Sequence, residues 1–297
     1  MITKNKKYWA RLFSTFIAGA ITVLVILTIV LSYISVNHYL HPPRKIAVGN
    51  TLAEQKVEYR SLDLITEDGI RLSAIYTPSK NGAVILLAHG YGGNRPEWLF
   101  AMLAKEGYGV LAWDARAHGM SDGDISTVGY YEVLDVKAAL EYALVQPDIK
   151  QIGAWGGSMG GATMIRAAVQ FPEIEALVVD SPYSSLEDTY NYLVPYPFIN
   201  PLVKFFAELQ TGIHIDDLRP VDEIAKISPR PILIIQGTGD KVVPSGTAEK
   251  LFEAAGETKY LWTEENVIHL GMFLNNPRKY KRKVIDFFNE YLINDFP

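Results

Sequence analysis

The chain contains no cysteine, and this absence excludes several kinds of chemistry. It rules out a thiol nucleophile, a cysteine-ligated metal centre and a disulfide framework. An excess of positive charge is also lacking, because the formal net charge is −5. A nucleic-acid partner requires a basic face, so the sequence gives no reason to expect one.

Internal repeats and low-complexity tracts are lacking as well. Hydrophobic residues make up 48% of the 297 residues and charged residues 21%, which is typical of a globular protein and argues against disorder. Residues 55–297 are long enough to bury one large core, so we expect a single folded domain there. Nothing in the sequence indicates the oligomeric state.

A long hydrophobic run is present near the N-terminus. The 25 residues 12–36 carry no charge and include 15 Leu, Ile, Val or Phe residues. As a helix this run would be about 37 Å long, enough to cross a hydrocarbon core of about 30 Å with some tilt. The sequence therefore predicts a basic tail over 1–11, a transmembrane anchor over 12–36 and a linker over 37–54, which Pro42 and Pro43 introduce.

The flanking charges predict how this anchor is oriented. Four basic residues precede the run, whereas two, Arg44 and Lys45, follow it in the linker. The positive-inside rule then places the N-terminus in the cytoplasm and the domain outside, at the cell membrane. A cleaved signal peptide is the alternative, but its apolar region usually spans about 7–15 residues and ends at a small-x-small site, which Val30–Ser32 matches poorly. A buried core helix is a further alternative, although nothing amphipathic marks the run.

Strand-like and helix-like segments alternate after the linker. Val57–Ile65 and Arg71–Tyr76 flank a turn and predict a hairpin. Short apolar runs predict strands buried on both faces: Ala83–Ala88, Gly109–Trp113, Gln151–Trp155, Ala176–Val179, Pro231–Ile235 and, as a further candidate, Tyr260–Trp262. Apolar residues at three- and four-residue spacing predict the helices Trp98–Lys105, Val128–Val145, Met159–Gln170, Thr247–Ala255 and Arg278–Leu292.

This alternation predicts an α/β fold with a mostly parallel, doubly wound sheet and helices on both faces. In such sheets, ligands bind beyond the carboxyl ends of the strands, so reactive residues are sought there. Residues 183–221 interrupt the alternation and are rich in aromatic residues and proline. We interpret this segment as a short cap over the site.

Residues 156–160 read Gly-Gly-Ser-Met-Gly and have the form G-x-S-x-G between a predicted strand and a predicted helix. Glycine neighbours permit the strained turn that raises a serine hydroxyl above the sheet. The helix that follows directs free N–H groups toward developing negative charge. We therefore expect Ser158 to be a nucleophile, with an ordinary glycine turn as the alternative.

A serine hydroxyl needs a base to take its proton, and histidine is the usual one. Only His214 and His269 follow Ser158 in the chain, and His214 lies in the predicted cap, which favours His269. The acid is expected between the nucleophile and the histidine. Asp240 follows a predicted strand there and would hold the imidazole. Asp180 also ends a strand and is the second candidate, although we expect it to satisfy backbone groups near the cap.

Two further loops carry polar residues at predicted strand ends. We expect the backbone N–H groups of Tyr91 and Met159 to form an oxyanion hole, because the glycine-rich backbone around Tyr91 can approach a substrate closely. His89 is expected to brace this loop. Asp114 and His118 lie in the next loop, where a metal site is conceivable, but no further ligand stands at suitable spacing. A polar network is the favoured interpretation, and neither a metal nor another cofactor is expected.

Four segments carry a family resemblance: His-Gly-Tyr-Gly-Gly-Asn (89–94), Asp-Ala-Arg-Ala-His-Gly-Met-Ser (114–121), Gly-Gly-Ser-Met-Gly (156–160) and Gly-Thr-Gly-Asp-Lys-Val-Val-Pro (237–244). Together they resemble the α/β-hydrolase superfamily, in particular its membrane-anchored serine esterases and monoacylglycerol-lipase-like enzymes. The resemblance covers residues 57–292. It implies a catalytic triad of Ser158, Asp240 and His269, oxyanion donors at Tyr91 and Met159, and ester hydrolysis without a cofactor. The predicted cap is short for large lipid substrates.

The sequence thus predicts a serine hydrolase that cleaves small to medium hydrophobic acyl or aryl esters through an acyl-enzyme intermediate. An acyltransferase would use the same triad with an acceptor other than water, and a peptidase would use it on an amide. A non-catalytic binding protein with the same fold is the alternative outside the enzymes.

Overall fold

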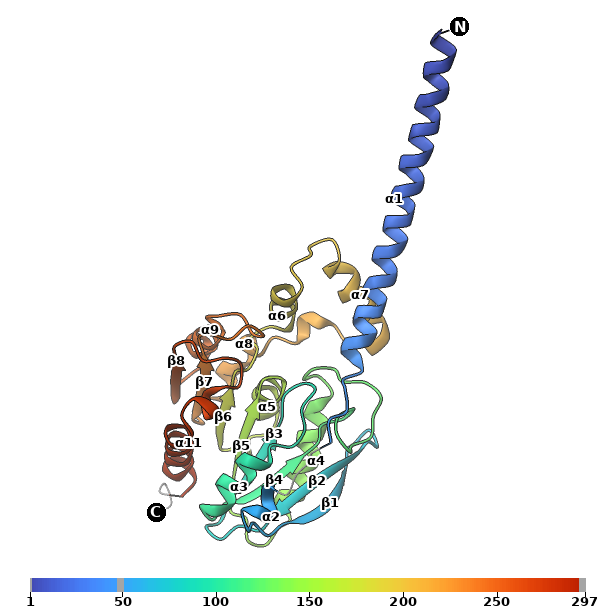
Figure 1. The fold of residues 1–297 in the computed structure, drawn as a ribbon. Helices are drawn as coiled ribbons and strands as arrows, with labels where there is room; N and C mark the ends of the chain where they lie inside the picture. Colours follow the sequence, from blue (N-terminus) through green and yellow to red (C-terminus); the bar gives the residue numbers. More distant parts are fainter. Residues whose placement is uncertain (1, 47–50, 294–297) are drawn as a thin grey trace.

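Helix α1 (Ile2–Leu40) projects from one side of a domain that is built around an eight-stranded sheet (Figure 1). The computed structural model describes residues 2–46 and 51–293. The strands are β1 (Arg60–Ile65), β2 (Arg71–Thr77), β3 (Ala83–Ala88), β4 (Gly109–Trp113), β5 (Gln151–Gly157), β6 (Ala176–Asp180), β7 (Ile232–Gly237) and β8 (Lys259–Glu264). The other helices are α2 (Thr51–Glu54), α3 (Glu97–Lys105), α4 (Glu132–Leu144), α5 (Met159–Gln170), α6 (Leu186–Leu193), α7 (Asn200–Thr211), α8 (Pro220–Glu223), α9 (Thr247–Ala254), α10 (Met272–Asn275) and α11 (Pro277–Leu292).

The strands lie in the order β1-β2-β4-β3-β5-β6-β7-β8. β2 pairs antiparallel with both β1 and β4, and every later pairing in this order is parallel. The mostly parallel sheet and the first hairpin are therefore confirmed. Because β3 to β8 run in the same direction, the loops after them meet at one edge of the sheet.

The central strand β3 shows how the sheet is buried between two helical layers. All six of its residues are buried. Val84 and Leu86 belong to the core beneath α4, α5 and α9, whereas Ile85 and Leu87 belong to the core beneath α3 and α11. Successive side chains of a strand point to opposite faces, so a run of apolar residues is required when both faces are covered.

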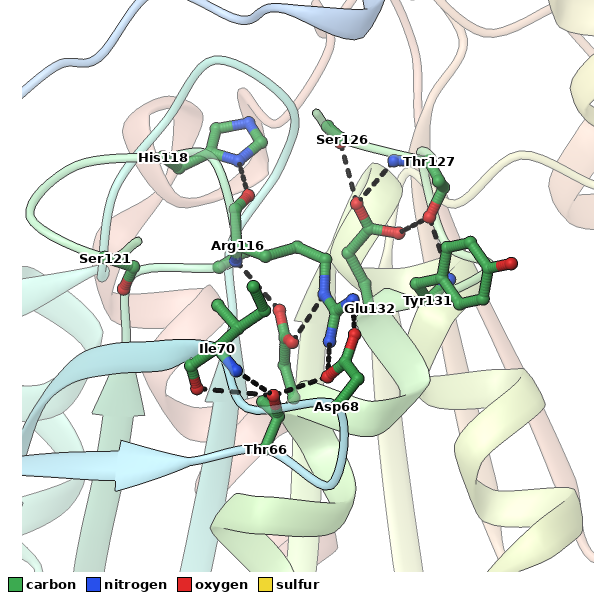
Figure 2. Close-up of polar contacts among 12 residues, drawn as sticks. Thr66, Asp68, Ile70, Arg116, His118, Ser121, Ser126, Thr127, Tyr131 and Glu132 are labelled. Carbon is green, nitrogen blue, oxygen red and sulfur yellow. Dashed lines mark hydrogen bonds and ion pairs between the residues drawn. The ribbon is translucent and has the colours of Figure 1, made fainter. Parts of the chain in front are cut away.

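The helix that the sequence predicts from Val128 begins only at Glu132, so this boundary is wrong. Val128 has φ of 55° and Gly129 has φ of 120°, and neither value fits a right-handed helix. The Glu132 carboxylate holds the turn by accepting hydrogen bonds from the N–H groups of Thr127 and Gly129, each at 2.8 Å. It also accepts the hydroxyls of Ser126 and Thr127, at 2.8 and 2.7 Å (Figure 2).

Helix α1 extends past both ends of the predicted anchor and contacts the cap. Its segment Asn5–Leu40 is long and apolar enough to cross a membrane. The helix ends four residues into the predicted linker, at Leu40, and its last turns lie beside α7 (Figure 1). Of the predicted linker, residues 47–50 lie outside the described residues, as do residues 1 and 294–297 at the chain ends.

The segment predicted as a cap, residues 183–221, contains α6, α7 and the start of α8. It leaves the sheet after β6 and returns before β7. α6 begins with an N-cap, because the Ser185 hydroxyl accepts the N–H of Asp188. The cap therefore has helical structure of its own, and one of its helices, α7, packs on the N-terminal helix.

Candidate active site

Ser158 occupies the turn between β5 and α5 in a strained conformation. Its φ of 53° and ψ of −119° are rarely adopted by a residue with a side chain. The turn is fixed to the neighbouring strand, because the Ser158 N–H donates to the Asp180 carbonyl at 2.8 Å. Its tightness requires glycine: a Cβ on Gly156 would lie 2.2 Å from the Gly160 oxygen, and one on Gly160 would lie 2.3 Å from the Ala88 oxygen.

The structure brings Ser158, His269 and Asp240 together from three segments of the chain. Ser158 Oγ lies 2.8 Å from His269 Nε2, and His269 Nδ1 lies 2.6 Å from Asp240 Oδ2. The second carboxylate oxygen of Asp240 accepts the N–H groups of Val242 and Val243, at 2.8 and 2.9 Å. These two donors, which follow Asp240 in the chain, hold the carboxylate against the imidazole.

The surroundings of Asp240 favour its ionised form. Burial raises the pKa of this carboxyl, but the hydrogen bonds from His269, Val243 and Val242 outweigh burial, and the pKa lies below its ordinary value. An ionised carboxylate at Nδ1 fixes the imidazole tautomer that carries its proton there. The unprotonated Nε2 then faces the serine hydroxyl and can accept its proton.

Asp180, the second candidate for the acid, lies in a separate buried network. Its Oδ1 accepts the Ser181 hydroxyl at 2.9 Å and its Oδ2 accepts the Tyr280 hydroxyl at 3.0 Å. Trp155 Nε1 in turn donates to the Tyr280 oxygen at 2.9 Å. The expectation that its carboxylate satisfies backbone groups near the cap is wrong, because its donors are side-chain hydroxyls. Burial raises the pKa of Asp180 to about 6, although both hydroxyls oppose this shift.

The residues expected as oxyanion donors border the space in front of Ser158. Tyr91 and Met159 line the same cavity as the serine. Gly90 packs directly against the nucleophile, since a Cβ there would lie 3.1 Å from Ser158 Cβ. The Tyr91 side chain donates its hydroxyl to the Tyr39 carbonyl of α1 at 2.8 Å. Sequence reasoning did not anticipate this contact.

Two buried histidines brace the loop that carries Tyr91. His89 Nε2 accepts the N–H of Ala115 at 2.9 Å, and His118 Nε2 accepts the N–H of Gly92 at 3.0 Å. Their Nδ1 atoms face backbone carbonyls at 2.7 and 2.8 Å. Burial lowers the pKa of both rings, that of His89 to about 4 with a contribution from the neighbouring His118. Both rings are therefore neutral at pH 7, so that Nε2 can accept a backbone N–H while Nδ1 donates to a carbonyl oxygen.

The loop after β4 is a polar network. The Asp114 carboxylate accepts the N–H groups of Arg95 and Met120, each at 3.0 Å. Arg116 pairs with Asp68 at 2.7 Å and with Asp135 at 2.8 Å; Figure 2 shows the contact with Asp68. Within the described residues, no three His, Asp or Glu side chains are grouped so that they could hold a metal ion.

A cavity of about 670 Å³ lies over Ser158. Its walls come from three parts of the chain: the strand-end loops, the cap and the end of α1. The α1 residues in the wall are Val36, Tyr39 and Leu40. Their three- and four-residue spacing is the signal that sequence reasoning missed, since it places all three on one face of a helix that continues past residue 36.

Comparisons with known proteins agree with this architecture. A family description of the alpha/beta hydrolase fold matches residues 83–210. An uncharacterised protein of Mycobacterium tuberculosis, Rv2307c, is 32% identical over 207 residues, which cover 67% of this chain and 68% of that protein. An uncharacterised protein of Escherichia coli K12, YfhR, is 26% identical over 297 residues, 95% of each chain. A solved structure of the Pyrococcus furiosus esterase Pf2001 has a TM-score of 0.70 and 29% identity, covering 85% of this chain and 98% of that one.

Proposed function

The chain belongs to the α/β-hydrolase superfamily, and on that premise we propose that it is a serine hydrolase that cleaves carboxylic esters. Ser158 is the nucleophile, His269 is the general base and acid, and Asp240 orients and stabilises the imidazole. The likeness to the Pf2001 esterase supports the reaction class. One observation carries the assignment of residues: two consecutive hydrogen-bond contacts, of 2.8 and 2.6 Å, join the serine hydroxyl to the imidazole and the imidazole to the carboxylate.

In the proposed mechanism, Ser158 Oγ attacks the ester carbonyl carbon while His269 Nε2 takes the hydroxyl proton. Negative charge then develops on the carbonyl oxygen, and the N–H groups of Met159 and Tyr91 stabilise it. The bond to the alcohol breaks, and the alcohol leaves with the proton from Nε2. Water adds to the acyl-enzyme by the same route in reverse, which releases the acid and returns the proton to Ser158.

The cavity supports a hydrophobic acyl or aryl group as the substrate. Most of its lining side chains are apolar, and they come mainly from the cap. Binding pockets of roughly 300–1,000 Å³ with few polar groups enclose ligands of moderate size. Apart from water, the described steps use only side chains and backbone groups of this chain, and they require no cofactor.

We further propose that α1 is a single-pass membrane anchor with the domain on the extracytoplasmic side. Its apolar length and the excess of basic residues before it support this arrangement. Protease added to intact cells is then expected to digest the domain. Protection of the domain, with digestion only after the cells are opened, would reverse the orientation.

The test of the catalytic assignment is Ser158→Ala in the full chain. Hydrolysis of p-nitrophenyl butyrate is expected to fall by about 10⁴-fold or more, because removal of a triad nucleophile leaves only the residual stabilisation by the oxyanion hole. The exposed Ser245→Ala is the matched control and is expected to retain wild-type activity. A fluorophosphonate probe is expected to label the wild type and the control at Ser158 and to leave Ser158→Ala unlabelled. Full activity in Ser158→Ala would contradict the assignment.

A further inference from the structure

The last turns of α1 are part of the cavity wall as well as the end of an anchor. Val36 and Leu40 are 2% and 6% exposed, and both line the cavity that contains Ser158. Tyr39 lines it too. A flexible tether would leave such residues exposed, so α1 enters the domain as a structural element.

Polar contacts fix this end of α1 to the loops around the nucleophile. The Leu40 carbonyl accepts the N–H of Ser126 at 2.8 Å, next to the pocket residue Thr127. The Tyr39 carbonyl accepts the hydroxyl of Tyr91. Just past the helix, the Arg44 guanidinium donates to the Gly123 carbonyl at 2.6 Å and also to the carbonyl of Ser121. These hydrogen bonds therefore fix the position of the α1 wall relative to the loops around Ser158.

Apolar contacts join the same end of α1 to the cap. The Tyr39 and Tyr190 rings meet edge to face with centroids 6.2 Å apart, and those of Tyr33 and Phe206 with centroids 5.6 Å apart. Val203 of α7 packs with Val36 and Leu40. The upper part of the cavity is thus enclosed by α1 and the cap together.

Helix geometry places this wall at the level of the membrane surface. Residue 24 is the centre of the uncharged run 12–36, and Val36 lies about 18 Å from it along the helix at about 1.5 Å per residue. Half of a hydrocarbon core is about 15 Å. The neighbouring cap also carries exposed large apolar side chains, a feature of surfaces that meet lipid: Tyr192, Tyr196, Phe198, Phe205 and Leu209.

From this placement we infer that the end of α1 determines acyl-chain preference, and that the site takes esters of long-chain fatty acids from the bilayer surface. The inference rests on the proposed ester hydrolysis and deepens it. Ser158 meets the ester group at the floor of the cavity, while the acyl chain extends between the cap and the face of α1 that carries Val36 and Leu40. The short sequence of the cap does not limit the substrate, because α1 completes the enclosure.

The dependence of kcat/KM on acyl-chain length measures the contact between the acyl chain and the α1 wall. Each methylene that a substrate buries improves kcat/KM by about fourfold, as long as the wall leaves room for it. We therefore expect kcat/KM of the full chain in lipid nanodiscs to rise along a p-nitrophenyl ester series from acetate through laurate to palmitate.

Val36→Trp tests the inference, because the larger side chain fills the part of the cavity beside α1. We expect kcat/KM for the laurate ester to fall by at least about tenfold, the equivalent of roughly two buried methylenes, and that for the acetate ester to stay within about twofold. Ile34→Trp is the matched control: it lies on the same helix, is 56% exposed and does not line the cavity. Its chain-length profile should match the wild type.

Parallel profiles for Val36→Trp and the wild type, with both active on acetate, would overturn the inference and leave the proposed function intact. If the wild type hydrolysed none of the esters, the proposed function itself would be rejected. A second measurement needs no substitution: a long-chain alkyl fluorophosphonate with a mid-chain diazirine is bound at Ser158 and photolysed. Cross-linking to the peptide that contains residues 36–40 supports the inference, whereas cross-links confined to other segments contradict it.

Discussion

Beneath Ser158 the cavity is bounded by loops that hydrogen bonds hold in place, whereas above it the cap and α1 meet through apolar and aromatic contacts. On the lower side, Asp240 accepts three N–H groups, and two neutral histidines each accept a backbone N–H. On the upper side, the contacts with α1 include the Tyr39–Tyr190 ring pair and the packing of Val203.

This difference indicates that the two sides have different functions: the lower side positions the reacting groups, and the upper side selects the substrate. Hydrogen bonds are directional and fix atoms to within a few tenths of an ångström, which the transfer of a proton requires. Apolar contacts are non-directional and scale with the area that is buried, which suits the selection of a chain by its length. Changes on the lower side should therefore alter the rate for every ester by the same factor, and changes on the upper side should alter which ester is preferred.

The largest effect is expected for Asp240→Asn. An amide at this position favours the wrong imidazole tautomer, and kcat is expected to fall by about 10⁴-fold, as for the equivalent change in serine proteases. The same factor should apply to the acetate and laurate esters of the p-nitrophenyl series. Asp180→Asn is the matched control, because it changes a buried aspartate at the end of the neighbouring strand that has no hydrogen bond to His269; its kcat should stay within about tenfold of the wild type. A larger loss in Asp180→Asn than in Asp240→Asn would exchange the roles of the two carboxylates.

The stability difference between the wild type and Asp180→Asn should depend on pH. Burial raises the pKa of Asp180 from 3.8 to about 6, so the folded protein binds this proton at a higher pH than the unfolded chain does. The ionised carboxylate therefore destabilises the fold above about pH 6, and this penalty disappears as the pH falls toward 4. The free energy of unfolding of the wild type minus that of the variant should rise by about 2 kcal/mol between pH 7 and pH 4.

Urea unfolding of the full chain in detergent at several pH values measures this difference. The same measurement on Asp240→Asn should give a pH dependence of the opposite sign, because the pKa of Asp240 lies below its ordinary value and its ionised form stabilises the fold. That contribution is present above about pH 4 and is lost as the pH falls further. A difference between the wild type and Asp180→Asn that stays constant with pH would mean that Asp180 is not buried as a carboxylate.

The lower side of the cavity was largely predictable from sequence, and the reason is local. The Gly-x-Ser-x-Gly pattern marks a strand-to-helix turn by itself, and the structure places Ser158 at that turn. Parallel strands bring their carboxyl ends to one edge, so Asp240, which follows β7, reaches the same edge without any knowledge of packing. The role of Asp180 was not predictable, because its partner Tyr280 lies 100 residues further along the chain.

The upper side was predictable only in outline. Apolar composition identifies α1 as a helix that can cross a membrane, but lipid and a protein cavity select the same side chains, so composition does not show where one environment gives way to the other. The packing of Val36 and Leu40 depends on Val203, more than 160 residues later. The predicted start of α4 was wrong for a similar reason. The Glu132 carboxylate organises the turn before the helix, and an apolar spacing pattern does not reveal such a turn.

The smallest effect is expected on the outer face of the cap, where Phe198 is 88% exposed. If this face meets the bilayer, Phe198→Ser removes an apolar side chain from the lipid surface, and kcat/KM should fall about three- to tenfold for a long-chain ester embedded in vesicles. The rate with a soluble acetate ester should not change, because Phe198 does not line the cavity. Stability should also stay within about 0.5 kcal/mol, since the residue is exposed.

Val145→Ser is the matched control for Phe198→Ser, because Val145 is 76% exposed but follows α4 at the amino edge of the sheet, away from the cap. It should leave both rates unchanged, since nothing places that edge against lipid. Equal losses in the two variants would mean that replacing any exposed apolar side chain by serine lowers the rate. An equal loss on soluble and vesicle-borne esters would mean that Phe198→Ser alters the geometry of the cavity. Only a loss confined to Phe198→Ser and to the embedded ester keeps the distinction between the two sides, because it separates access to the substrate from the reaction at Ser158.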